Sequence, residues 1–128
     1  MSVEKHDKDV AAASVEALPV LPSLNIHESM EFYRDKLGFE ATVYEAHDYL
    51  IMRRPGIELH FWLTDRKDFC ENTSVYIRGG GIDALHAELS QRDGFTITPM
   101  MDREWGMREF YVHDPHGNLL RFGRELPQ

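Results

Sequence analysis

A stretch near the C-terminal end of the chain combines aromatic and acidic side chains at spacings that suit a binding site. Trp105 comes first, and Glu109 and Tyr111 follow at alternate positions of an extended segment that runs to His113. Alternate residues of a strand point to the same face, so Glu109 and Tyr111 share one face and Phe110 lies on the other. An indole and a phenol beside a carboxylate can stack a flat ring and hydrogen-bond its polar groups. This pattern indicates a site for a planar, polar small molecule.

The sequence Asp-Pro-His-Gly at 114–117 predicts a tight turn after this strand. Proline presets its own φ, glycine tolerates positive φ, and aspartate can bond back to the backbone. A second strand follows, in which Leu120 and Phe122 alternate with Arg121. Arg121 is therefore predicted on the same face of the hairpin as Glu109.

The elements that must position this hairpin occur in two similar halves. The first half is predicted to contain a strand at Leu18–Leu21 ended by Pro22, a helix at His27–Leu37, and strands at Phe39–Ala46, Tyr49–Arg53 and Ile57–Leu63. The second half is predicted to contain a strand at Thr73–Arg78, a helix at Ile82–Gln91, a strand at Phe95–Pro99 and the hairpin. Residues 65–72 form a polar linker, Asn25 is the predicted N-cap of the first helix, and Gly38 its predicted stop.

The predicted fold class is therefore α+β, with two tandem βαβββ modules at about 18–64 and 73–124 that form a concave mixed sheet. The modules belong to a single predicted domain, 17–128, and residues 1–16 form an N-terminal tail. Pro19 and Pro22 indicate that the first strand lies at a sheet edge.

Strand alternation places a mixed polar and aromatic set on one face of the two modules: Glu58, His60, Trp62, Ser74, Tyr76, Arg78, Glu109, Tyr111, His113 and Arg121. This face suits a concave ligand site. The alternative for Trp62 and Tyr76 is that they pack in a dimer interface or in a filled sheet interior, and the alternative for Trp105 is that it only fixes the hairpin.

The hairpin resembles that of the bleomycin resistance proteins in the vicinal oxygen chelate, or glyoxalase, superfamily. The resemblance lies in Trp-Gly-x-Arg-Glu-Phe at 105–110 followed by Asp-Pro-x-Gly-Asn at 114–118, and it extends over about 18–124 through the repeated modules. It implies a cytoplasmic homodimer, with a possible exchange of the N-terminal strand, that sequesters the drug in a groove shared by two subunits. Trp105 and, less directly, Tyr49 match the aromatic residues of that groove.

The resemblance also allows a test for the metal that superfamily enzymes bind with four side chains. The four positions fall at Leu18 or Pro19, at His60, at Ser74 and at Arg121. Only His60 is a competent ligand, and a guanidinium would repel a cation. We therefore expect no catalytic residue, no metal and no cofactor. The expected ligand-binding residues are Trp105, Tyr49, His60, Trp62, Tyr76, Glu109, Tyr111 and Arg121. A metal-dependent lyase or thiol transferase, or a binder of another aromatic molecule, remains the alternative.

Composition sets further limits. The 128 residues carry a formal net charge of −8, which argues against nucleic acid and suits a cationic aromatic ligand, although solubility alone also explains it. No apolar run is long enough to span a bilayer and no secretory signal is evident, so the cytoplasm is the expected compartment. The single cysteine, Cys70, has no partner for an internal disulfide and is expected to be a bystander.

Overall fold

The computed structural model describes residues 14–127 and has the predicted α+β architecture of two βαβββ modules. The first module contains β1 (Val20–Ser23), α2 (Ile26–Glu31), β2 (Glu40–Tyr44), β3 (Tyr49–Arg54) and β4 (Ile57–Leu63). After α3 (Lys67–Glu71), the second module contains β5 (Ser74–Arg78), α4 (Ile82–Ser90), β6 (Met101–Asp102), β7 (Met107–His113) and β8 (Leu119–Glu125). Of the predicted tail, residues 1–13 lie outside the described residues.

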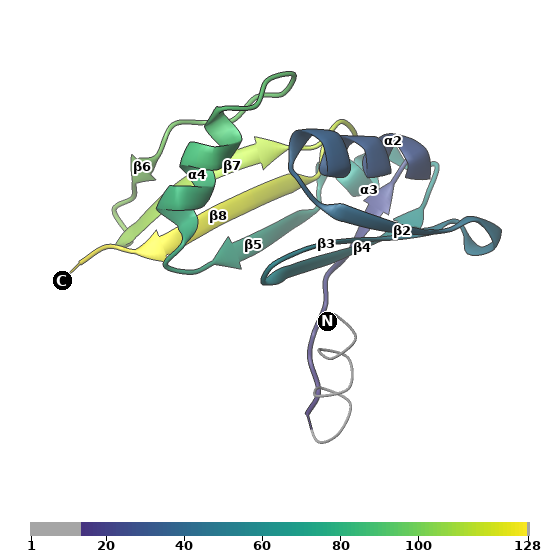
Figure 1. Cartoon of the computed structure of the whole chain (residues 1–128), viewed down its shortest axis with the longest axis horizontal. Coiled ribbons are helices and arrows are strands. Elements are labelled where there is room, and N and C mark those ends of the chain that lie inside the picture. Colours follow the sequence, from purple (N-terminus) through teal and green to yellow (C-terminus); the bar gives the residue numbers. More distant parts are fainter. Residues whose placement is uncertain (1–13, 128) are drawn as a thin grey trace.

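Each module forms its own four-stranded mixed sheet, and the two sheets have the same strand order. The orders are β1-β4-β3-β2 and β5-β8-β7-β6, with β1 parallel to β4 and β5 parallel to β8. The sheets lie side by side, and α2 and α4 cover the same side of them (Figure 1). In this repeat, His60 of β4 and Arg121 of β8 occupy equivalent positions in the second strand of each sheet.

The apolar faces of the strands form one core beneath the helices. Alternation correctly predicted its members in β4, β7 and β8, which are Leu59, Phe61, Phe110, Val112, Leu120 and Phe122. Phe110 and Phe122 are paired in the register and stack with ring centroids 4.5 Å apart. Burial of each such side chain contributes about 1.5–3 kcal/mol, so this face fixes the register of the hairpin. The opposite face of the same strands is thereby directed away from the core.

The first strand differs from its prediction. β1 begins at Val20, and Pro22 lies inside it opposite Trp62 instead of ending it. A proline is tolerated there because β1 is an edge strand, and its missing N–H faces away from β4. The predicted edge position is confirmed.

The first helix is capped as predicted but is shorter. The Asn25 side chain accepts a hydrogen bond from the Glu28 N–H, and Gly38 has the positive φ of 79° that ends the segment. The α-helix ends at Glu31, and residues Phe32–Lys36 form a π-helical turn. Apolar spacing alone does not distinguish this turn from a continued α-helix.

Three other segments also differ. The predicted strand at Phe95–Pro99 is wrong: only Ile97 forms an isolated bridge, to Val112, and the strand of this position is Met101–Asp102. Pro99 cannot donate to the ladder, and the Thr98 side chain takes the Tyr111 N–H at 2.9 Å. The strand predicted to reach Ala46 ends at Tyr44 in a 3-10 turn. The predicted linker contains α3, which buries Cys70.

The turn between β7 and β8 anchors the second module to the first. The buried Asp114 carboxylate accepts backbone N–H hydrogen bonds from His116, Gly117 and Asn118 at 2.9–3.0 Å. Its other oxygen accepts from the Tyr33 hydroxyl of the first module at 2.9 Å. The predicted turn is confirmed, with Gly117 at a φ of 110°. Asp114 therefore supports the turn and the contact between modules at once.

Two neighbours of Asp114 extend this contact. Asn118 donates its side-chain N–H to the Pro22 carbonyl at 2.9 Å. The Nδ1 atom of buried His116 accepts from the Leu24 N–H at 3.2 Å, while Nε2 lies 2.9 Å from Glu28. Because a carboxylate can only accept, His116 carries its proton on Nε2 when neutral. The turn is thus bound to the end of β1 and the start of α2.

Candidate functional site

Five of the eight predicted site residues converge on the second sheet. They are Trp105, Tyr76, Glu109, Tyr111 and Arg121, and we call them the Glu109 cluster. One oxygen of the Glu109 carboxylate accepts from the Tyr76 hydroxyl at 2.6 Å and from the Trp105 indole N–H at 3.2 Å. The other accepts from the Tyr111 hydroxyl at 2.7 Å and lies 3.5 Å from the Arg121 guanidinium. The side chains therefore form one hydrogen-bonded group.

The strand register explains this convergence. Tyr76, Arg121 and Tyr111 are direct neighbours across β5, β8 and β7, and Glu109 lies opposite Gly123. A Cβ atom at position 123 would lie 2.6 Å from the Tyr76 hydroxyl, so the glycine leaves the path by which Tyr76 reaches Glu109. Glycine inside a strand commonly marks such a close approach, and this signal was present in the sequence.

Trp105 reaches the cluster from the loop before β7. The loop is closed by the Arg103 N–H to the Met107 carbonyl at 2.7 Å, and Gly106 adopts a φ of 85°. The indole is hydrogen-bonded to Glu109, yet the residue is 56% exposed. The ring is therefore held at one edge and accessible elsewhere.

The charge of Glu109 is stabilised inside the protein. Burial would raise the pKa of its carboxyl, but the hydrogen bonds from Tyr76, Tyr111 and Trp105 and the charge of Arg121 outweigh burial and lower this pKa to about 2. Burial and the same carboxylate raise the pKa of the Tyr76 phenol. At neutral pH the cluster thus holds the Glu109 carboxylate in its charged form and the Tyr76 phenol in its neutral form.

Two guanidinium groups lie over the rings of the cluster. Arg121 lies 4.9 Å from the Tyr76 ring centroid and 5.7 Å from that of Tyr111. Arg103, which was not predicted as a site residue, lies 5.4 Å from the Trp105 ring and donates to the Tyr111 hydroxyl at 3.1 Å. The face combines aromatic rings with cationic donors, a surface that suits stacking and hydrogen bonding to acceptor groups.

The other three predicted residues gather on the first sheet. His60 accepts at Nδ1 from the Tyr49 hydroxyl at 2.8 Å and donates from Nε2 to Glu58 at 2.7 Å. Burial raises the pKa of the Glu58 carboxyl, but hydrogen bonds from His60 and Arg53 outweigh it and lower that pKa. Trp62 is opposite Tyr49 in the register and is 39% exposed. Alternation had placed Glu58 on this face, although not among the eight residues.

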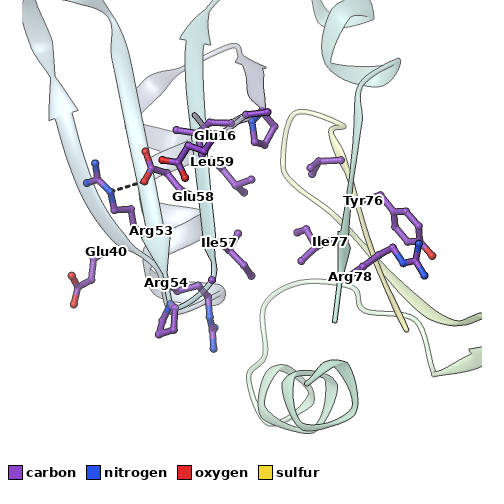
Figure 2. Close-up of a pocket in the computed structure, with 17 residues that line it drawn as sticks. Glu16, Glu40, Arg53, Arg54, Ile57, Glu58, Leu59, Tyr76, Ile77 and Arg78 are labelled. Carbon is purple, nitrogen blue, oxygen red and sulfur yellow. Dashed lines mark hydrogen bonds and ion pairs between the residues drawn. The ribbon is translucent and has the colours of Figure 1, made fainter. Parts of the chain in front are cut away.

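The first-sheet residues and the Glu109 cluster form two sets, and the hydrogen bonds described for each set stay within its own sheet. A cavity of about 980 Å³ lies between the two sheets. Ile57 and Leu59 face Ile77 across it, and Tyr76 extends from the other side of β5 (Figure 2). Glu58, the hydrogen-bond partner of His60, and Tyr76 of the Glu109 cluster both line this cavity. Its volume is in the range of small-molecule sites.

The donors on these strands do not fit a superfamily metal. At the four aligned positions, His60 is hydrogen-bonded at both ring nitrogens and Arg121 contacts Glu109. Ser74 is exposed, and neither Leu18 nor Pro19 has a side-chain atom that can bind a metal. In residues 14–127, no three His, Cys, Asp or Glu side chains gather in a way that could hold a metal ion. Over the same range, no helix has the length and apolar character needed to cross a membrane.

Comparisons with known proteins agree with the hairpin motif. The bleomycin resistance protein of Geobacillus stearothermophilus is 25% identical over 130 residues, which cover 88% of this chain and 98% of that protein. The bleomycin-binding protein of Streptomyces verticillus, solved with copper(II)-bleomycin, is 33% identical, with a TM-score of 0.74 over 89% of this chain and 97% of that chain.

A further solved bleomycin-binding protein, complexed with bleomycin, shares the fold with a TM-score of 0.74 at 22% identity, over 88% of this chain and 99% of that chain. Residues 7–127 of the chain match the family described as glyoxalase superfamily protein. This match includes both modules, the Trp105 loop and the Asp114 turn. The chain therefore belongs to the glyoxalase superfamily, and relatives within it are bleomycin resistance and bleomycin-binding proteins.

Proposed function

We propose that this protein binds bleomycin-type glycopeptide antibiotics and confers resistance by sequestering them without chemical change. The observation that carries this proposal is the Trp105 indole, which is 56% exposed and is held by the buried Glu109 at 3.2 Å. A ring that is both accessible and fixed can stack on a planar group at little entropic cost. The complex of the Streptomyces verticillus relative with copper(II)-bleomycin supports this choice of ligand.

The other seven predicted residues are proposed to complete the site. Glu109 acts through the rings that it holds, and the remaining contacts come from the exposed or half-buried side chains of Tyr49, His60, Trp62, Tyr76, Tyr111 and Arg121. On the second sheet, Arg121 pairs with the Glu109 carboxylate and Arg103 lies over the Trp105 ring, so the planar, uncharged part of the ligand suits this surface. The cationic part of the ligand would lie away from these arginines, where it can interact with the excess of carboxylates in a chain of net charge −8.

We propose that the complete groove requires a homodimer. The residues of the two sets hydrogen-bond within separate sheets, and a second copy could bring the first sheet of one subunit against the second sheet of the other. The exposed aromatic side chains Trp62, Tyr76 and Trp105 would then be covered in part by the partner or the ligand. Exchange of the N-terminal strand is part of the same proposal, because β1 is an edge strand.

A second candidate function is enzymatic, and one observation favours it. Glu58, His60 and Tyr49 form a continuous hydrogen-bonded chain, an arrangement that can move a proton. The superfamily mechanism needs a metal as Lewis acid, and the residues at the aligned positions do not fit one. We therefore place binding ahead of catalysis.

The proposed function is tested by titrating the purified protein with metal-free bleomycin and with copper(II)-bleomycin, by calorimetry and by tryptophan fluorescence. We expect saturable binding of both forms and recovery of the drug with unchanged mass. Drug recovered with an altered mass would establish the enzymatic alternative. If neither form of the drug binds, the proposal is contradicted.

The shared groove is tested by co-expressing two differently tagged variants, Trp105→Ala and Tyr49→Ala. If each groove takes its Trp105 and its Tyr49 from different subunits, the purified mixed dimer has one groove with both defects and one intact groove. We then expect wild-type affinity at half of the sites. If both residues of a groove come from one subunit, every site of the mixed dimer would be weakened.

A further inference from the structure

Glu109 differs from the other seven predicted site residues in its burial. Glu109 is 1% exposed, whereas Trp105, Tyr76 and Trp62 are each at least 39% exposed. A ligand on this face cannot reach the carboxylate without displacing the rings that cover it. The role of Glu109 must therefore be exerted through its neighbours.

We propose that Glu109 is the positioning residue of the ligand face: its buried carboxylate orients the rings of Trp105, Tyr76 and Tyr111 and so determines affinity without touching the ligand. For the identity of that ligand, this inference rests on the proposed function. The three rings come from three different segments, which are the loop before β7, strand β5 and strand β7. Glu109 is an acceptor shared by all of them.

The donor groups around Glu109 require an acceptor at this position. An indole N–H can only donate, so Trp105 needs an acceptor at this point, whereas a tyrosine hydroxyl can also accept. Each Glu109 oxygen receives a phenol hydroxyl at 2.6–2.7 Å, distances typical of charge-assisted bonds. Arg121, which lies 3.5 Å from the carboxylate, balances its charge. The loop of Trp105 is thereby tied to the sheet through one side chain.

A purely structural role predicts a different outcome. Removing one partner of a buried ion pair is costly when the other charge stays buried, but the Arg121 side chain is 34% exposed and can be hydrated when Glu109 is replaced by an apolar residue of similar volume. If Glu109 only filled space, Glu109→Met would keep both the position of the indole and the affinity for the ligand. If Glu109 positions the rings, Met would preserve the fold and release the Trp105 indole.

The first measurement does not require bleomycin. The chain has two tryptophans, so the indole N–H signal of Trp105 can be assigned in a ¹H–¹⁵N spectrum with Trp105→Phe. We expect this signal to move in Glu109→Met and acrylamide to quench Trp105 more readily. The control is Glu104→Gln, which changes the exposed carboxylate of the residue that precedes Trp105 in the sequence. An indole signal that is unchanged in Glu109→Met would overturn the proposal.

The second measurement is a double-mutant cycle on bleomycin affinity. We expect Glu109→Met to weaken binding about tenfold, the effect of losing a hydrogen bond to a charged group, and to add little when Trp105 is already alanine. An equal loss in both backgrounds would contradict positioning through Trp105. If the wild-type protein binds no bleomycin, the proposed function fails, while the indole signal still decides the role of Glu109.

A milder variant keeps the test valid if Glu109→Met does not fold. In Glu109→Gln, the amide carbonyl can still accept from Trp105 and Tyr76, while its NH₂ group faces Tyr111 and Arg121. The Tyr111 hydroxyl can accept a hydrogen bond from this NH₂ group, whereas the Arg121 guanidinium cannot. We expect the Trp105 signal to be retained and affinity to fall less than in Glu109→Met. Loss of the indole signal in Glu109→Gln would contradict this geometry.

Discussion

Replacement of Gly123 by alanine tests whether the Glu109 cluster depends on an empty position in β8. The new Cβ would lie 2.6 Å from the Tyr76 hydroxyl and 3.2 Å from Glu109 Cγ, so Tyr76 must move. Tyr76 is 39% exposed and can swing outward, which gives up its hydrogen bond to Glu109. The substitution therefore breaks one identified contact instead of disrupting the core.

The magnitude follows from two opposing effects. Loss of a hydrogen bond to a charged group costs about 1.5–3 kcal/mol. Alanine in place of glycine restricts the unfolded chain and returns about 0.4–1 kcal/mol, since φ at position 123 is not in the left-handed region. We expect a net destabilisation of about 1–2 kcal/mol, or a fall in melting temperature of roughly 4–8 °C. Ligand affinity should fall as well, because the Tyr76 ring leaves its position.

Urea denaturation with a double-mutant cycle measures this effect. With Tyr76→Ala in place, only the 3.2 Å contact with Glu109 Cγ remains, and Gly123→Ala should become much less destabilising. Gly79→Ala is the matched control, because a Cβ there meets nothing within 4 Å. Equal destabilisation by Gly123→Ala in the wild-type and Tyr76→Ala backgrounds would refute the reasoning.

Further expectations concern affinity, pH, metal and the turn. Trp105→Ala should weaken bleomycin binding roughly ten- to hundredfold with little change in melting temperature, and Tyr49→Ala should cost less; unchanged affinity with a lower melting temperature would make Trp105 a structural plug. Because the pKa of Glu109 is depressed to about 2, its charge should contribute roughly 3 kcal/mol to the free energy of unfolding above about pH 4.5, and this contribution should be lost as pH falls through 2. Circular dichroism during acid unfolding measures this loss, and an equally steep transition in Glu109→Gln would argue against it. Elemental analysis should find no stoichiometric divalent metal, and chelators should leave bleomycin binding unchanged. One bound metal per subunit that is lost in His60→Ala would instead support the metal-dependent enzyme. Asp114→Ala should destabilise the protein by about 3–5 kcal/mol in urea, because the Tyr33 hydroxyl and three backbone N–H groups lose their acceptor, and a loss below 1 kcal/mol would contradict that role.

The parts of the fold that the sequence predicted correctly are those set by local chemistry. The turn at 114–117 follows from its Asp, Pro and Gly residues, and β4 was predicted with the bounds that the structure shows. Alternation on neighbouring strands was enough to place Tyr76, Tyr111 and Arg121 on one face with Glu109. The hydrogen bonds of the cluster follow from that placement and from the donor types.

The features that were missed depend on contacts distant in sequence. The interval 95–99 has the composition of a strand, but Thr98 and Pro99 prevent a continuous ladder with β7. Pro22 was expected to end a strand, and only the edge position of β1 explains why it does not. Arg103 gave no local signal, because its role depends on how its loop folds back toward Trp105 and Tyr111.

The Asp114 turn also makes each of the two repeats depend on the other for its hydrogen-bond partners. If the backbone were cut in the segment 65–72, the second fragment would carry Asp114 without the Tyr33 hydroxyl, and the first would expose the Pro22 carbonyl and the Leu24 N–H. Neither repeat could satisfy these groups by itself, although each has the strand order of a complete sheet. The repeats have thus become complementary parts, and we expect the separated fragments to reassociate on mixing. A reporter divided at this position would then regain its signal only when both fragments are present.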